Sequence, residues 1–261
     1  MTTTRGIVLR TTPVRESDLV VTLYTEEHGR IGALARGGRR SQRRFAGALS
    51  VLVLAQWRLG RPPRGDLWSL EAADVEREWT QLGTDVVGVA HASYALELVG
   101  ALLPAEVPEP SVLELVVALW DVLAASGPSP AALRGVELAL LELAGHRPAL
   151  DACAACHAPV AGGAVFDASR GGAICRACAP ASRGPGVRQF EEGAGAYLCA
   201  IAEVAELGVV VGLDRDPRFS PADRHAARDA MVAMVTSLAE RPLRSLEYIA
   251  KLGAAVARRD A

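Results

Sequence analysis

The sequence predicts an α+β protein in two parts: a small barrel of short strands, followed by a helical bundle domain with an inserted four-cysteine zinc knuckle. Three observations indicate this architecture. Short apolar runs rich in β-branched residues fill the first 80 residues, the apolar period lengthens to three and four residues from about residue 85, and two C-x2-C pairs interrupt the helical part. We therefore expect a barrel domain over 1–80 and a helical domain over 81–261, with the knuckle at 150–180.

The strands of the barrel are separated by residues that favour turns. Thr12-Pro13 and His28-Gly29 separate the first three apolar runs, and a stretch rich in Gly and Pro over 60–65 separates the last two. Five strands of this length fit the OB-fold, and they fit an SH3-like barrel equally well. The expected strands cover 7–9, 19–24, 31–34, 51–57 and 67–70.

Apolar residues at three- and four-residue spacing predict the helices of the second part. The first helix ends before Pro104, and Gly127-Pro128 and Gly145 bound the next two. The cysteine pairs follow the third helix, and the helical period resumes after them. The expected helices cover about 85–102, 111–123, 130–143, 191–207, 221–239 and 242–257.

The composition is that of a globular protein without an export or membrane segment. Half of the 261 residues are hydrophobic and 22% are charged. The N-terminus lacks the apolar core of a signal peptide, and acidic residues interrupt every apolar stretch long enough to span a bilayer. We expect a cytoplasmic protein with no membrane partner.

Positive charge is concentrated near the N-terminus, although the whole chain has a net charge of −2. The first 64 residues contain 12 arginines and four acidic residues, so their local net charge is +8. Such a field attracts phosphate backbones. The density is highest in residues 36–44, which follow the third predicted strand and which we call the arginine segment. The candidate DNA-binding residues are Arg30, Arg36, Arg39, Arg40, Arg43, Arg44 and Phe45.

Two roles fit Phe45, which follows the arginine segment directly. Its ring would stack on a base, as aromatic residues do in OB-fold sites, or it would anchor the segment in the hydrophobic core. The barrel has few other aromatic residues, and we expect Trp57 and Trp68 in the core or at the barrel rim. This composition predicts binding dominated by phosphate contacts and tolerant of sequence.

Four of the five cysteines form a C-x2-C-x18-C-x2-C pattern. Each pair directs two thiolates at one point, and a hairpin in the intervening residues would bring the pairs together. Four sulfurs about 2.3 Å from one ion complete a tetrahedral zinc site with no open position, which predicts a structural ion. A redox-active pair and rubredoxin-like iron are the alternatives, and Cys199 stands outside the pattern. The expected ligands are Cys153, Cys156, Cys175 and Cys178.

No sequence pattern indicates catalysis. The phosphate-binding loop of ATPases, the H-E-x-x-H and G-x-S-x-G motifs and the dinucleotide-binding glycine pattern are absent. We therefore expect neither an enzyme nor a nucleotide cofactor. Asp74, Glu76 and Glu78 would hold Mg²⁺ in a nuclease, but carboxylates at such spacing on a strand are more often a solvated face.

Along nearly its whole length the chain resembles the bacterial recombination mediator family RecO. No single motif is decisive, but the order and spacing of the similar segments are together specific. These segments are 6–10, 15–20, 25–30, 35–41, 65–71, 92–97, 140–148 and 240–247.

The resemblance implies an OB-fold followed by a helical domain that carries a four-cysteine zinc knuckle. Family members bind single- and double-stranded DNA and anneal complementary strands. They also act with RecR to load RecA recombinase on DNA coated by single-stranded-DNA-binding protein (SSB), which implies association with the nucleoid. The family knuckle often has glycine where this chain has His157, so we expect a less relaxed backbone there.

The SSB tail is acidic and ends in an apolar residue, so it would need a hydrophobic pocket rimmed by cations. The candidates for this contact are the arginines that lie near apolar residues of the last helices: Arg224, Arg228, Arg241 and Arg244. A zinc-ribbon-containing regulator or an RNA-binding module is the alternative function, because a basic barrel with a cysteine site fits that class as well.

Overall fold

The protein forms two compact units in the computed structural model. One unit is Met1–Gly127 together with Ser245–Ala261, and the other is Pro128–Arg244. The sequence predicted a boundary between a barrel domain and a helical domain at residue 80, and this boundary stays a prediction. The first compact unit contains the barrel together with helices that follow residue 80. The structure describes residues 1–14, 16–45, 47–61, 65–160 and 164–257, without the side chains of 42, 43 and 253–257.

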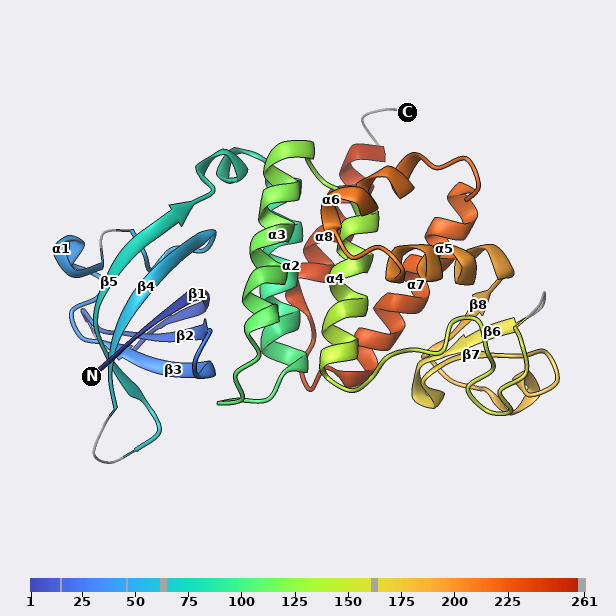
Figure 1. Ribbon diagram of the computed structural model, residues 1–261, viewed down its shortest axis with the longest axis horizontal. Coiled ribbons are helices and arrows are strands. Elements are labelled where there is room, and N and C mark those ends of the chain that lie inside the picture. The colour runs from blue at the N-terminus through green and yellow to red at the C-terminus, as the bar shows by residue number, and fades with distance from the viewer. Residues whose placement is uncertain (15, 46, 62–64, 161–163, 258–261) are drawn as a thin grey trace. The chain divides into compact units, whose positions relative to one another are not determined.

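A closed barrel forms the N-terminal part of the first unit (Figure 1). Its order is β1-β2-β3-β5-β4, with β3 and β5 paired in parallel and the other neighbours antiparallel. This is the strand order of an OB-fold, so the structure confirms that fold over the SH3-like alternative. The strands are β1 (Thr2–Pro13), β2 (Leu19–Thr25), β3 (Gly29–Ala35), β4 (Val53–Gly60) and β5 (Trp68–Glu78).

Each predicted strand lies within or overlaps an observed one, but β1 and β5 are longer than expected. β1 pairs with β4 along its first half and with β2 along most of its length, with a register shift between Val8 and Arg10. Pairing with β4 at its N-terminal end and with β2 at its C-terminal end extends the strand into threonine-rich residues that have no apolar pattern. β5 likewise continues to Glu78, which pairs with Val53 of β4.

The barrel interior is filled by alternate side chains of its strands. Trp57 is fully buried, and its indole Nε1 donates a hydrogen bond to the carbonyl of Gly6 at 2.9 Å. Trp68 is 8% exposed and belongs to the same core. The expected core placement of both tryptophans is confirmed, and neither ring is available to a base.

Helices α2 (Val86–Leu102), α3 (Pro110–Ser126) and α8 (Arg244–Ala257) belong with the barrel. The Tyr24 hydroxyl of β2 donates to the carbonyl of Glu109 at 3.2 Å, just before α3. The indole of Trp79, which follows β5, donates to the carboxylate of Asp121 on α3 at 2.8 Å. At the start of α8, the backbone N–H of Ser245 donates to Glu97 of α2 at 2.9 Å.

The second unit is a helical bundle with a small sheet (Figure 1). The helix expected over 130–143 is confirmed at both ends. The helix expected over 191–207 is wrong at its C-terminus, because it ends at Ala202 and a separate turn of helix begins at Leu207. Leu207 packs closely on Gly135, because a Cβ atom at position 135 would lie 2.9 Å from the Leu207 side chain. The helices are α4 (Pro130–Leu143), α5 (Glu192–Ala202), α6 (Leu207–Val210) and α7 (Pro221–Leu238).

The sheet of the second unit has the order β7-β6-β8, with β6 (Ala164–Asp167), β7 (Gly172–Ile174) and β8 (Val187–Phe190). β6 and β7 are the hairpin expected between the two cysteine pairs. β8 was not expected, and it is held by Phe190, whose ring lies 5.3 Å from that of Phe166. Within the described residues, no helix is both long and apolar enough to cross a membrane.

Candidate nucleic-acid interface and metal centre

The arginine segment leaves the barrel after β3 and ends in the short helix α1 (Gln42–Phe45). The loop between β1 and β2 holds it in place. The Asp18 carboxylate accepts from the backbone N–H of Gly37 at 2.8 Å, and the N–H of Arg39 donates to the carbonyl of Ser17 at 3.1 Å. Gly37 has φ +64°, a conformation that favours glycine, so the turn has a defined shape.

The arginine side chains of this segment are held mainly by neutral groups. Arg39 donates to the carbonyl of Glu16, and Arg44 donates to the Ser41 hydroxyl and to the carbonyl of Arg36. Among the described residues of this segment, Arg40 forms an ion pair, with Glu16 at 3.5 Å. Both of these side chains are largely exposed. The positive charge is therefore poorly compensated. The described and exposed members are Arg36, Arg39, Arg40 and Arg44, whereas the side chain of Arg43 lies outside the described residues.

The structure does not bring Arg30 to the arginine segment. Arg30 is half-buried on β3, and its Nη2 donates to the carbonyl of Leu103 at 3.2 Å. Six residues of extended chain separate Arg30 from Arg36, which corresponds to about 20 Å. Arg30 thus anchors the connection between α2 and α3, and its role in DNA binding stays a proposal.

Phe45 does not stack on bases, as one of its two predicted roles would require. Its side chain is 2% exposed and packs in the barrel core, so a base cannot stack on it in this structure. Of the two roles that fit the sequence, the anchor is the one observed. The guanidinium of Arg44 lies 5.1 Å from the centre of the ring, so burial of Phe45 also fixes the exposed end of the arginine segment.

An uncharged surface on β2 and β3 adjoins the arginine segment, and sequence reasoning did not single it out. Val20 pairs with Leu34 and Thr22 pairs with Gly32, and all four are half-buried on the face opposite the core. The sequence carries no signal for it, because the runs over 19–24 and 31–34 do not alternate between apolar and polar residues. In OB-folds this face of strands 2 and 3 receives oligonucleotides.

The four cysteines of the C-x2-C pairs converge on one point. Their sulfur atoms all lie within 4.8 Å of one another, and the Sγ atoms of Cys156 and Cys175 are 3.7 Å apart. Sulfurs in tetrahedral contact with zinc are separated by about 3.8 Å, because each lies about 2.3 Å from the ion. The group therefore fits one tetrahedral ion with four thiolate ligands.

Backbone hydrogen bonds shape both cysteine turns. The N–H of His157 donates to the carbonyl of Cys153 at 2.8 Å, and that of Ala179 donates to the carbonyl of Cys175 at 2.9 Å. His157 has φ +61°, so the expected strain at this position is confirmed. The convergent group in the described part of the chain consists of cysteines alone, and Cys199 lies half-buried on α5 outside it.

The thiols of this group differ in acidity. Burial opposes ionisation of Cys153, but backbone N–H groups, that of Cys175 foremost, lower its pKa to about 6. Hydrogen bonds with Cys156 and Cys175 raise the pKa of Cys178 to about 12. Metal loading must displace the protons that these thiols share, so acid favours the metal-free form.

The four candidate arginines for a partner contact do not form one cluster. Arg224 is committed to the fold, because it donates to the carbonyls of Leu213 and Asp216. Arg228 pairs with Asp229 at 2.9 Å and lies 3.1 Å from Nε2 of His225. Arg241 and Arg244 are exposed at the end of the unit.

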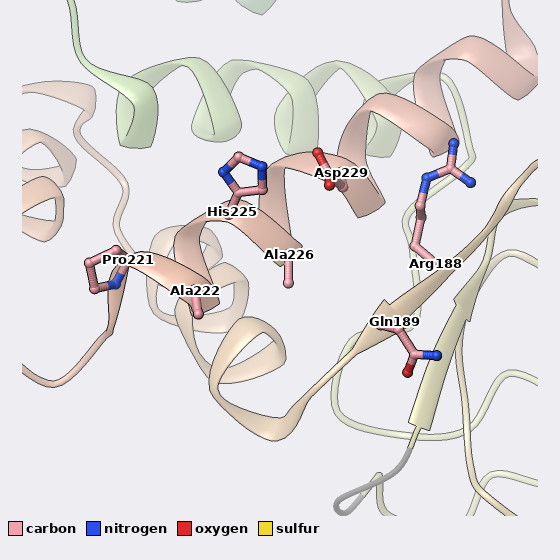
Figure 2. A pocket seen from close by; sticks show the side chains of 7 residues that line it. All are labelled: Arg188, Gln189, Pro221, Ala222, His225, Ala226 and Asp229. Atoms are coloured by element: carbon pink, nitrogen blue, oxygen red, sulfur yellow. The ribbon is translucent and has the colours of Figure 1, made fainter. Parts of the chain in front are cut away.

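A hollow lies between β8 and α7 (Figure 2). One of its lining residues, Asp229, directly follows Arg228 in the sequence. Pro221, Ala222 and Ala226 give it an apolar lining from α7, and His225 and Asp229 add polar groups. Arg188 lines it from β8. The hollow combines small apolar side chains with a cation at its rim.

These features define an OB-fold protein with a poorly compensated basic segment and a helical domain whose four cysteines could hold a metal ion. Residues 1–78 match the family model described as Recombination protein O N terminal, and residues 83–247 match that described as Recombination protein O C terminal. The chain therefore belongs to the RecO family of DNA repair proteins.

Relatives in several bacteria carry the name DNA repair protein RecO. The protein of Anaeromyxobacter sp. (strain K) is 40% identical over 95% of both chains. That of Myxococcus xanthus is 31% identical over 95% of this chain and 96% of its own. That of Geobacter sulfurreducens is 38% identical over 66% of this chain and 71% of its own.

We predict that Cys175→Ser lowers both metal content and stability. Removing one thiolate of a closed site should abolish retention of about one zinc ion per chain and lower the thermal midpoint, because structural zinc contributes folding energy. Metal analysis after dialysis and a thermal melt measure both effects. Cys199→Ser is the matched control, and equal metal content in the two variants would contradict the assignment.

Proposed function

We propose that the chain is a non-enzymatic mediator of DNA repair and homologous recombination. It binds single- and double-stranded DNA, anneals complementary strands and, with RecR, helps to load recombinase on SSB-coated DNA in the cytoplasm, at the nucleoid. Membership of the RecO family supports this proposal. The observation that carries it is the poorly compensated arginine segment beside the uncharged face of β2 and β3.

The burial of the barrel aromatics supports phosphate-dominated contact. Tyr24 and Trp57 are fully buried, Phe45 is 2% exposed and Trp68 is 8% exposed. OB-fold proteins that hold single strands by stacking need accessible rings. A surface of arginines without such rings neutralises backbones and leaves base edges unread, as annealing of two strands requires. We place the contact with RecR on the same barrel, as an extension of the family resemblance.

The alternative functions have less support. A duplex-reading regulator uses a basic recognition helix, whereas α7 balances Arg224 and Arg228 with Asp223 and Asp229. RNA binding through the barrel remains the alternative function. Comparing the affinities for an RNA and a DNA oligonucleotide of the same sequence distinguishes the two functions.

Ion pairs account for the acidic residues on β5 that a nuclease would use to hold Mg²⁺. Glu76 accepts from Arg5 at 2.9 Å, and Asp74 lies 3.7 Å from Arg58. These carboxylates compensate arginines of the barrel surface, so we propose no catalytic role for them. The metal that we propose for the protein is a structural zinc ion on the four cysteines.

Substitution of Arg36, Arg39, Arg40, Arg43 and Arg44 by alanine should weaken binding of single-stranded DNA at least about tenfold at low salt. The slope of log affinity against log salt should become shallower by up to about 3.5, because each phosphate contact with a single strand contributes about 0.7. Fluorescence anisotropy across a salt series measures both quantities.

The control for this variant removes the same charge elsewhere, through Arg58, Arg147, Arg215, Arg218 and Arg241, all exposed. Its salt slope should stay close to that of the unmodified protein. If both variants lose affinity and slope equally, net charge and not the arginine segment determines binding.

We place the acidic SSB tail in the hollow between β8 and α7 (Figure 2). The small side chains of Ala222 and Ala226 leave room for an apolar terminal residue, and Arg188 at the rim suits an acidic chain. Arg228 lies beside it and pairs with Asp229, and both Arg188 and Arg224 donate to backbone carbonyls while keeping their positive charge.

Ala226→Glu should weaken binding of a labelled acidic peptide ending in phenylalanine at least about tenfold, because a carboxylate would occupy the apolar lining and repel the peptide. Anisotropy titration measures the effect, with a thermal melt to establish folding. Arg147→Glu, on an exposed site of the same unit, is the control. Unchanged affinity in Ala226→Glu would remove the hollow as the tail site.

A further inference from the structure

The arginines of the cysteine knuckle differ from those of the surrounding helices. In the described part of the second unit, ion pairs join Arg134 to Glu137, Arg147 to Glu142, Arg218 to Asp216 and Arg228 to Asp229. Residues 150–190, which comprise the knuckle and the strand β8 that follows it, contain four arginines and two acidic residues, of which Asp151 precedes the first cysteine pair. No ion pair among the described residues involves these arginines, which are Arg170, Arg176, Arg183 and Arg188.

The acidic residue of the knuckle sheet is used internally. Asp167 is 2% exposed, and its carboxylate accepts from both the N–H and the hydroxyl of Ser169. Burial opposes ionisation of Asp167, but hydrogen bonds from Ser169 and Ser182 keep its pKa below the usual value. It caps the turn after β6 and does not neutralise a surface arginine.

Two of the knuckle arginines are connected through Ser182. The Arg170 Nη1 donates to the hydroxyl of Ser182 at 3.2 Å, and Arg183 follows Ser182 in the chain. Arg170 ends the turn after β6, and Arg183 belongs to the segment before β8, so two separate parts of the knuckle each contribute an arginine at Ser182. Both side chains are exposed.

Arg176 is also exposed but lies inside the second C-x2-C pair, and Arg188 lines the hollow beside α7. Four thiolates on a divalent ion would keep two negative charges, which Arg176 is placed to offset. Arg170 and Arg183 therefore carry the uncompensated charge of the knuckle.

We propose that this surface, formed by Arg170 and Arg183, is a second binding site for a nucleic-acid backbone. It would let one molecule hold two strands, one on the barrel and one on the knuckle. This inference rests on the proposed annealing function and adds a second site to it. Arginines held by neutral partners retain their charge for phosphates.

An acidic peptide is the other class of ligand that arginines attract, and the surface does not favour it. Peptide recognition requires apolar pockets for anchoring side chains. The exposed large hydrophobic residues of the described chain include none within the knuckle. A phosphate backbone needs positive charge without such a pocket.

The test is a capture assay with the full, zinc-loaded protein. A biotinylated oligonucleotide is immobilised, protein is bound, and a labelled oligonucleotide that is not complementary to the first is added. The double variant Arg170→Ala with Arg183→Ala should bind the first strand within about twofold of the unmodified protein. It should capture the second strand at least about tenfold less, with unchanged zinc content.

The control variant is Arg147→Ala with Arg218→Ala, which removes the same charge from the same unit at ion-paired positions. Capture by this control should equal that of the unmodified protein. Equal capture by the knuckle variant, or no capture by the unmodified protein after it has bound the first strand, would overturn the second site. Loss of acidic-peptide binding without loss of capture would also overturn it, whereas failure to bind even the first strand would instead reject the proposed function.

Discussion

The parallel pairing of β3 with β5 is the constraint on which the barrel and its basic surface depend. Ala33 pairs with Trp68 and Leu34 with Ser69, and this short contact closes a barrel that is otherwise a chain of antiparallel neighbours. Because β3 is paired on both sides near its end, the following residues must leave the sheet. Those residues are the arginine segment. Burial of Phe45 then returns the chain to the core, so the arginines lie in a loop fixed at both ends.

The knuckle meets a different constraint, because its strands are too short to form a stable sheet by themselves. β6, β7 and β8 have four, three and four residues, and a sheet of this size buries little apolar surface. Contact between Phe166 and Phe190 supplies part of the missing stabilisation. A metal ion on the four cysteines would supply the rest, since it would join the turn before β6 to the turn after β7. The ion would thereby also set the positions of the exposed arginines around it.

Local patterns predicted the parts of the fold that local chemistry determines. The ends of α4 follow from Pro130 after the capping hydroxyl of Ser129 and from the glycine at 145, and the cysteine spacing predicted both hairpin and convergence. Contacts between residues far apart in the chain could not be predicted from the sequence. Asp214 accepts from the Ser129 hydroxyl at 2.5 Å across 85 positions, β8 depends on pairing with β6, and burial decided between two roles for Phe45. Half-buried, uncharged residues on β2 and β3 became a candidate surface only once their neighbours were known.

We propose that the arginine segment of the barrel neutralises DNA strands so that they can pair. The most direct measurement is annealing of two complementary oligonucleotides coated with SSB, without ATP, followed by fluorescence energy transfer. The unmodified protein should anneal them, and the variant lacking the five arginines of residues 36–44 should not, although its thermal midpoint is unchanged. Annealing at equal rates by both proteins, or binding of DNA without annealing of coated strands by the unmodified protein, would contradict the account.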